Sequence, residues 1–245
     1  MRRVRGTILL SLLWTASAAA QSVSPPIAEY QEKARSSFQL QNASIFPITV
    51  VLEVRGFDIT EQGEVIDTPL DTSRVHVKLS EMSFRLPPRG TRRVFYEAEG
   101  DTLPAWFNIL SAMTGARTET GLNVRILLPH VVYLNQKQPL RRGDVAVTRI
   151  EVDSGSGKAR VQLENRGSRL GRVYQLKLSA GDHSGQSAGG FPLLPGKRRW
   201  AEVDWAGDTA PSRLMIRFAR FTIDTLLSSL SASPTPKSAA VVYRP

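Results

Sequence analysis

The chain has 245 residues, of which 41% are hydrophobic and 22% charged, with 32 Lys and Arg against 22 Asp and Glu, for a net charge of +10. This composition is that of a globular protein, and the length suits one large domain or two small ones. The absence of cysteine excludes disulfide scaffolds, thiol catalysis and cysteine-ligated metals, and the three histidines, His76, His130 and His183, lie too far apart in sequence to indicate a metal site. We therefore expect no metal and no cofactor.

Residues 1–20 have the pattern of a secretory signal peptide. A start with three arginines is followed by an apolar run from Thr7 to Trp14 and by small residues at 16–20. The apolar run is shorter than the about 20 residues that span a bilayer, and no later run is long enough. Because a secreted chain without cysteine fits the bacterial envelope, we predict a protein of the periplasm, exported by this leader and not stably inserted in a membrane.

Loss of the leader would remove three of the 32 basic residues, leaving 29 against 22 acidic ones, a net charge of +7. The remaining basic clusters, at 92–93, 141–142 and 197–199, lie beside expected turns. Such positions keep loops and edges soluble, whereas nucleic-acid binding needs aromatic residues or a helix to place the basic groups. We expect no nucleic-acid partner.

After the leader, the sequence reads as short strands separated by turn residues. Strand-like runs in a first block are residues 38–41, 48–54, 75–79, 82–86, 93–97, 106–110 and 122–134. A second block has such runs at 145–152, 159–164, 173–178, 199–205 and 214–223. Strands at spacings of about 8 to 12 residues, with Gly- and Ser-rich turns between them, are typical of an all-β sandwich.

We predict two β-sandwich domains, at residues 21–139 and 145–224, because proline, glycine and charged residues interrupt the pattern near the linker, 140–144. A Ser- and Pro-rich composition predicts a flexible tail over 225–245. Within that tail, the run 241–243 could add a last strand or stay loose, and the sequence favours neither.

Four motifs of the first block stand in a distinctive order. They are a strand, an Asn and Pro turn and a β-branched strand at 38–50; a strand, a Pro-x-Gly turn and a strand at 82–94; Leu-Pro and a strand at 103–109; and a long apolar strand ending at 129–134. In this order they resemble the first domain of the periplasmic pilus-assembly chaperones, the PapD-like family. Residues 159–167 and 189–197 are similar to parts of the family's second domain. The resemblance implies a divergent, PapD-like member with two immunoglobulin-like β-sandwich domains.

The resemblance also implies a function. Chaperones of this family bind pilus or surface-fibre subunits by donor-strand complementation, in which the chaperone lends a strand to a subunit that lacks one. Backbone hydrogen bonds of an edge strand give such a contact affinity, and alternate side chains fill the subunit's groove. We therefore expect a periplasmic chaperone whose partners are pilus or fibre subunit proteins.

Val124, Ile126 and Leu128 have the spacing of a donor strand, i, i+2 and i+4, with Arg125 turned the other way. Pro129 follows them, and because proline lacks a backbone donor it is tolerated at a sheet edge but not in a central strand. The same three apolar residues would also suit the core of the first sandwich, and the sequence leaves both interpretations open.

The family resemblance further implies an Arg in the first strand and a Lys in the last strand of the first domain, which grip the subunit's C-terminal carboxylate. This sequence departs from that pattern. The candidate carboxylate anchors are Arg35, just after the expected first strand, and Arg125, the only basic residue between Leu122 and Leu134. A planar guanidinium suits both oxygens of a carboxylate, and a solvated arginine is the alternative in each case.

Two other classes of function are weighed against a chaperone. The family's aromatic-Arg-Pro ending is replaced at 133–136, which favours a structural or adhesive β-sandwich protein of the cell envelope. Residues 185–189 match G-x-S-x-G, but a nucleophile elbow needs a strand before it and a helix after it, and Ser187 lies in a Gly/Ser-rich stretch with no expected helix. We therefore expect no enzymatic activity.

Overall fold

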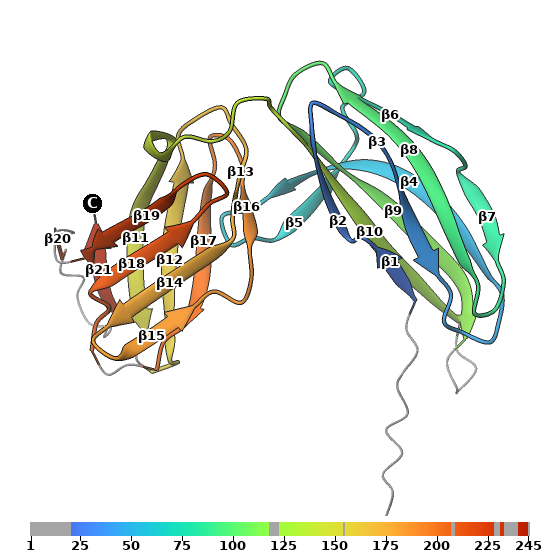
Figure 1. The fold of residues 1–245 in the computed structure, drawn as a ribbon. Helices are drawn as coiled ribbons and strands as arrows, with labels where there is room; N and C mark the ends of the chain where they lie inside the picture. Colours follow the sequence, from blue (N-terminus) through green and yellow to red (C-terminus); the bar gives the residue numbers. More distant parts are fainter. Residues whose placement is uncertain are drawn as a thin grey trace, which may run out of the picture.

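The computed structural model describes residues 21–244 apart from 118–122, 154, 207–208, 228–230 and 233–239. The expected signal peptide and most of the expected tail lie outside these residues. The described residues form strands, turns and the short 3-10 turn η1 (Arg142–Asp144), and they contain no helix long and apolar enough to cross a membrane. The all-β fold class is confirmed, and Figure 1 shows the chain as two β-sandwiches.

The first sandwich consists of two sheets, with the strand orders β1-β3-β8-β6 and β2-β10-β9-β4-β5, and β7 adds to the second by pairing with β4. Its strands are β1 (Ser22–Ser24), β2 (Ile27–Gln31), β3 (Lys33–Gln41), β4 (Ile48–Ile59), β5 (Val65–Thr68), β6 (Val75–Leu79), β7 (Ser83–Leu86), β8 (Thr91–Gly100), β9 (Ala105–Arg117) and β10 (Asn123–Asn135). The core between the sheets includes Phe38, Leu52 and Phe107, which are fully buried. The first strand crosses between sheets, since β1 pairs with β3 and the chain continues after Pro25 and Pro26 as β2 against β10.

Alternation of apolar and polar residues sets the faces of these strands. In β8, Val94, Tyr96 and Ala98 are buried, and the residues between them are exposed. Successive side chains of a strand point to opposite faces, so each such strand turns one face to the core and the other to solvent.

A buried asparagine fixes a corner of the first sandwich. Asn42 donates through Nδ2 to the carbonyls of Phe46 (2.8 Å) and Pro87 (2.9 Å). Its Oδ1 accepts from the N–H of Ser44 (3.0 Å). One side chain therefore ties the turn after β3 to the turn after β7. These turns belong to the sequence motifs at 38–50 and 82–94.

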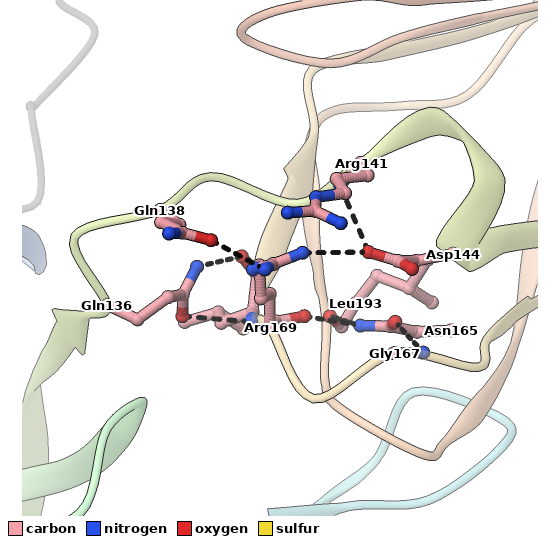
Figure 2. Close-up of polar contacts among 9 residues, drawn as sticks. Gln136, Gln138, Arg141, Asp144, Asn165, Gly167, Arg169 and Leu193 are labelled. Carbon is pink, nitrogen blue, oxygen red and sulfur yellow. Dashed lines mark hydrogen bonds and ion pairs between the residues drawn. The ribbon is translucent and has the colours of Figure 1, made fainter.

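Asn165 has the same role in the second sandwich. Its Nδ2 donates to the carbonyls of Arg169 (2.7 Å) and Leu193 (3.1 Å), and its Oδ1 accepts from the N–H of Gly167 (3.0 Å), as Figure 2 shows. The two asparagines form equivalent corners, which explains why an apolar strand followed by Asn occurs in both halves of the sequence.

The second sandwich has a sheet of order β17-β12-β11-β21-β20, a sheet of order β15-β14-β18-β19 and the pair β13-β16. Its strands are β11 (Val145–Asp153), β12 (Lys158–Asn165), β13 (Gly171–Val173), β14 (Gln175–Ala180), β15 (His183–Gln186), β16 (Phe191–Leu193), β17 (Arg198–Asp204), β18 (Arg213–Arg217), β19 (Thr222–Leu226), β20 (Ser231–Ala232) and β21 (Ala240–Arg244). Val161, Leu163, Leu176 and Leu214 are fully buried in its core.

This second core extends beyond the residues expected for it. Leu140, in the expected linker, is packed in it, and so is Leu227, in the expected tail. The N–H of Leu227 donates to the carbonyl of Ser212 (2.8 Å) directly after β19. Farther on, β21 pairs antiparallel with β11 from Ile150 to Asp153, so the C-terminal run is a strand. These residues belong to the sandwich because they are buried or pair with distant strands. The composition of the segment does not indicate either feature.

The two sandwiches contact each other where β4, β5 and β10 reach the second one (Figure 1). Phe57 and Tyr133 of the first sandwich pack with Leu170 and Leu194 of the second in an apolar cluster separate from both cores. This cluster removes apolar surface from water and thereby holds the sandwiches together.

Polar contacts add to this apolar cluster. The N–H of Trp200 in β17 donates to the carbonyl of Glu61 (2.6 Å), and Lys197 forms an ion pair with Asp58 (2.7 Å). Both contacts join the β4–β5 hairpin to the second sandwich.

The segment that follows β10, residues 136–144, is also bonded to the second sandwich, as Figure 2 shows. The Gln136 amide donates to the carbonyl of Leu170 (3.2 Å) and accepts from its N–H (3.1 Å). Arg169 donates to Gln138 (2.7 Å) and lies 3.5 Å from the carboxylate of Asp144. These bonds restrict the direction in which the chain leaves β10.

We expect Asn42→Ala to lower the free energy of unfolding by about 2 to 4 kcal/mol, because it removes the hydrogen bonds that this fully buried side chain makes to the carbonyls of Phe46 and Pro87 and to the N–H of Ser44. Asn165→Ala should lower it by a similar amount for the same reason. Urea denaturation measures both losses, with Gln39→Ala, at an exposed position of β3, as the control. A loss below about 0.5 kcal/mol for either asparagine, the range of ordinary surface changes, would contradict this role.

Candidate functional site

One half of β10 lacks a paired strand on one side among the described residues. β9 pairs with β10 from Asn123 to Leu134, whereas β2 pairs with it in parallel only from Val131 to Asn135. No described strand pairs with the other side of residues 123–130, which we call the open edge. The unpaired backbone groups of such an edge can accept a strand from another chain.

The direction of the backbone groups along β10 follows from one hydrogen bond. The N–H of Val131 points away from β9, since it donates to the carbonyl of Pro26 (2.8 Å). In a strand every second residue directs its N–H and C=O the same way, so the backbone groups of Leu127 and the nitrogen of Pro129 also face the open edge. The missing N–H of Pro129 therefore removes no bond to β9, which explains how a proline fits within β10.

Two of the three predicted donor residues lie at the rim of the first core. Ile126 and Leu128 are half-buried and pack against the core cluster. Val124 is more exposed, at 37%, and it precedes an irregularity in the β9–β10 register, where β9 has an extra residue. Ile126 and Leu128 thus share one face of β10, on which they contact the core and still keep exposed surface.

The structure does not bring Arg35 and Arg125 together. Arg35 lies on the outer face of the β1-β3-β8-β6 sheet, where it forms an ion pair with Glu97 (3.0 Å). Arg125 is exposed and lies in β10, in the other sheet, on the side opposite to Ile126. The core of the sandwich separates the two guanidinium groups, so they do not form one carboxylate site.

The contact between the sandwiches contains a different basic residue, Arg172, which belongs to the second sandwich. Arg172 of β13 forms an ion pair with Glu29 of β2 and lies over the ring of Tyr133, with 5.3 Å to the ring centre. Its Nη2 is buried and has no hydrogen-bond partner among the described residues. Burial raises the pKa of Tyr133, and the charge of Arg172 opposes this rise. No sequence pattern indicates the pair, because only the contact between the sandwiches brings Glu29 and Arg172 together.

A cavity of about 270 Å³ lies beside this ion pair. Its lining includes Glu29, Arg172, Tyr174 and Phe221, together with part of the segment 136–140. Neither Arg35 nor the residues of the open edge line it, so the cavity and the open edge are separate features of the surface.

His130 marks the point at which the open edge ends. Its ring is fully buried and stacks on Phe38, with 4.7 Å between ring centres. Nδ1 lies 2.7 Å from the carbonyl of Pro25 and Nε2 lies 3.0 Å from the hydroxyl of Tyr96, which in turn contacts the Tyr30 hydroxyl at 3.0 Å. Burial lowers the pKa of His130. The histidine therefore holds the crossing from β1 to β2 in place from inside the core, a role that its position in the sequence does not indicate.

Residues 185–189 do not form a nucleophile elbow. Gly185 and Gln186 end β15, and the described chain then turns into β16 without a helix. The hydroxyl of Ser187 donates to the carbonyl of Gly189 (3.3 Å). Within the described part of the chain, no group of three or more His, Asp or Glu side chains could hold a metal ion.

No family model and no curated protein matches the sequence. Solved structures match the fold. The class 5 fimbriae chaperone CfaA is 11% identical with a TM-score of 0.53, over 84% of this chain and 98% of that one. A complex of the Salmonella enterica SafA pilin with the SafB chaperone gives 13% identity and a TM-score of 0.53, over 85% and 96%. The Escherichia coli chaperone DraB is 11% identical with a TM-score of 0.50, over 85% of this chain and 98% of that one.

These likenesses confirm the fold that the sequence motifs implied, two immunoglobulin-like sandwiches in the PapD-like arrangement. At identities of 11 to 13%, these structures show the fold alone.

We expect the free energy of unfolding to fall as the pH drops below about 6.5, the ordinary pKa of histidine in an unfolded chain. Burial lowers the pKa of His130 in the folded state, so between that lowered value and the ordinary one the unfolded chain binds a proton that the folded chain does not. The stabilisation is complete above the ordinary pKa and is lost on acidification.

Urea denaturation at pH values from about 8 to 5 measures this dependence. His130→Gln should flatten the fall in stability, while His183→Gln, at an exposed histidine of β15, should leave it as in the unchanged chain. An equally steep fall in His130→Gln would show that another group is its source.

Proposed function

We propose that this protein is a periplasmic chaperone that binds subunits of a pilus or surface fibre through the open edge of β10. The observation that carries the proposal is the edge itself, which is unpaired over residues 123–130 and has half-buried apolar side chains at its rim. The fold supports it, since solved structures of similar fold include a class 5 fimbriae chaperone and a chaperone in complex with a pilin.

Donor-strand complementation would explain why a strand edge is left unpaired. A fibre subunit that lacks a strand exposes an apolar groove and unpaired backbone groups, a combination that favours aggregation. The open edge would supply the missing strand, with the N–H and C=O of Leu127 pairing to the subunit backbone. Ile126 and Leu128 would supply alternate side chains to the groove.

The burial of these two side chains determines which partners the edge favours. Because Ile126 and Leu128 are already half-buried, complete burial adds only about 1 kcal/mol for each of them. Most of the gain must then come from apolar surface of the partner. The edge therefore favours a subunit with an open groove over a complete sandwich, and it would release the subunit once another strand fills that groove.

Arg35 and Arg125 take no part in this proposal as a joint carboxylate anchor, because they lie on opposite faces of the first sandwich. Export through a cleavable signal peptide at residues 1–20 would bring the protein to the periplasm, where fibre subunits are held before assembly. The proposed function needs no cofactor and no catalytic step.

An affinity pull-down of the tagged chain from its native periplasm, with mass spectrometry of the bound proteins, tests the proposal. We expect a small β-rich partner at one copy per chain, released only by denaturant. Ile126→Asp should reduce its capture more than tenfold, because a buried carboxylate in the subunit groove would lose its hydration. Val124→Asp, at a more exposed position of the same edge, should also reduce capture.

The control is Phe95→Asp, at a 57% exposed side chain on the outer face of the other sheet, which should capture the partner normally. Thermal melting of each variant identifies any that fails to fold, and Val124→Asp keeps the test valid if Ile126→Asp unfolds. A monomer without a partner, purified while the surface structures are being made, would contradict the proposal and favour a structural or adhesive envelope protein.

A further inference from the structure

A row of apolar side chains crosses three strands next to the open edge. Leu127 of β10 is paired with Ala112 of β9, and Ala112 is paired with Val51 of β4. Directly paired residues share one face of a sheet, and this is the face opposite to the core. Leu127 and Val51 are 54% and 49% exposed. These two side chains, on either side of Ala112, leave an uncovered apolar strip that ends at the open edge.

The same face leads toward the second sandwich. Val131 and Tyr133 follow Leu127 at even spacing along β10, and both belong to the contact between the sandwiches. We call this side of the β2-β10-β9-β4-β5 sheet the inner face. A partner on the open edge therefore meets the inner face as well as the core-side residues Ile126 and Leu128.

A shallow groove of about 440 Å³ on the inner face is formed by this strip and a charged rim. Glu53 on the rim is ion-paired with Arg55 (2.7 Å), and Asp67 accepts a hydrogen bond from Asn108 (3.4 Å). Arg125 also lines the groove, and it has no ion pair or hydrogen bond among the described residues. Asp67 keeps its negative charge, because its donor is a neutral amide, but it lies on β5, three strands away from β10. The charge next to the open edge is therefore the positive charge of Arg125.

The backbone of β10 fixes how a partner strand would lie. The N–H and C=O of Leu127 face the open edge, whereas Pro129 offers only its carbonyl there. Leu127 is thus a residue at which a complete pair of backbone bonds can form, whereas Pro129 is not. A partner residue paired with Leu127 has its side chain on the inner face, and the partner residue two positions along lies beside Arg125.

We propose, on the basis of the proposed function, that the subunit strand that pairs with the open edge is apolar on both of its faces and carries an acidic residue for Arg125. We call this strand the client strand, and the subunit to which it belongs the client. On the inner face it presents an apolar side chain opposite Leu127 and, two positions away, an Asp or Glu that pairs with Arg125. Its other face covers Ile126 and Leu128. Arg125 and Leu127 therefore select among clients, in addition to the residues that fill the client's groove.

Photocrosslinking of the native complex tests the position of the client strand. A photoreactive benzoylphenylalanine at position 127 should crosslink to one segment of the co-purified client, located by mass spectrometry, with an Asp or Glu two positions from the crosslinked residue. The same group at position 95, on the outer face of the other sheet, should give no crosslink to the client.

The charge is tested by the rate at which the purified complex dissociates. Arg125→Glu should release the client about fivefold faster at low salt, with less difference at high salt, and Arg125→Lys should restore most of the binding. Arg93→Glu, the same change at an exposed arginine of β8, should leave the rate unchanged. A client in which this acidic residue is replaced by Lys should bind the Arg125→Glu variant better than the unchanged client does.

The outcomes separate this inference from the proposed function. If the unchanged chain captures no client, the proposed function fails and the inference fails with it. If a client is captured and Val124→Asp weakens it, but position 127 gives no crosslink or Arg125→Glu dissociates at the normal rate, the inference alone is wrong and the client contacts only the core side of the edge.

Discussion

The feature on which the candidate site depends is the length over which β2 covers β10. β2 begins only after Pro25 and Pro26, where the chain crosses between the sheets, and so it pairs with β10 from Val131 onward. Neither proline can donate a backbone hydrogen bond, so the crossing cannot continue the ladder toward the start of β10. His130, bonded to the carbonyl of Pro25, holds the crossing at this point from within the core. One strand, β10, therefore has an unpaired edge in its first half and is held in the sandwich by β2 in its second half.

The contact between the sandwiches complements that edge. Phe57 and Tyr133 pack on the second sandwich, and Arg172 of the second sandwich pairs with Glu29 of β2, the strand that stops short of the open edge. The parallel strand β2 is thereby held from both sides, by His130 within the core and by Arg172 across the cleft. Such support would keep β2 in place if a partner strand bound along the other half of the same edge.

The sequence predicted most of the long strands, because these depend on local alternation, but it predicted no strand for β5, β15 or β16 and joined β18 and β19 in one run. Asn42 and Asn165 were visible as turn residues, whereas their bonds to Pro87 and Leu193 reach turns that are distant in sequence. It predicted Ile126 and Leu128 as one face of a strand, but it could not distinguish core from edge, and the structure places them at the boundary of the two. Arg35 and Arg125 looked equivalent as carboxylate anchors only because sheet membership is not visible in a linear pattern. Leu127 was overlooked for a related reason, since its importance comes from Ala112 and Val51, which are distant in sequence.

The most direct measurement of the central claim is amide hydrogen exchange of the chain alone and in complex with its co-purified client. The N–H of Leu127 should exchange rapidly in the free chain, because it faces the open edge, and slowly in the complex, where a client strand bonds to it. The N–H of Val131, which already donates to Pro26, should be protected in both states. Slow exchange of Leu127 in the free chain, or no added protection in the complex, would contradict the account of β10 as a strand lent to a partner.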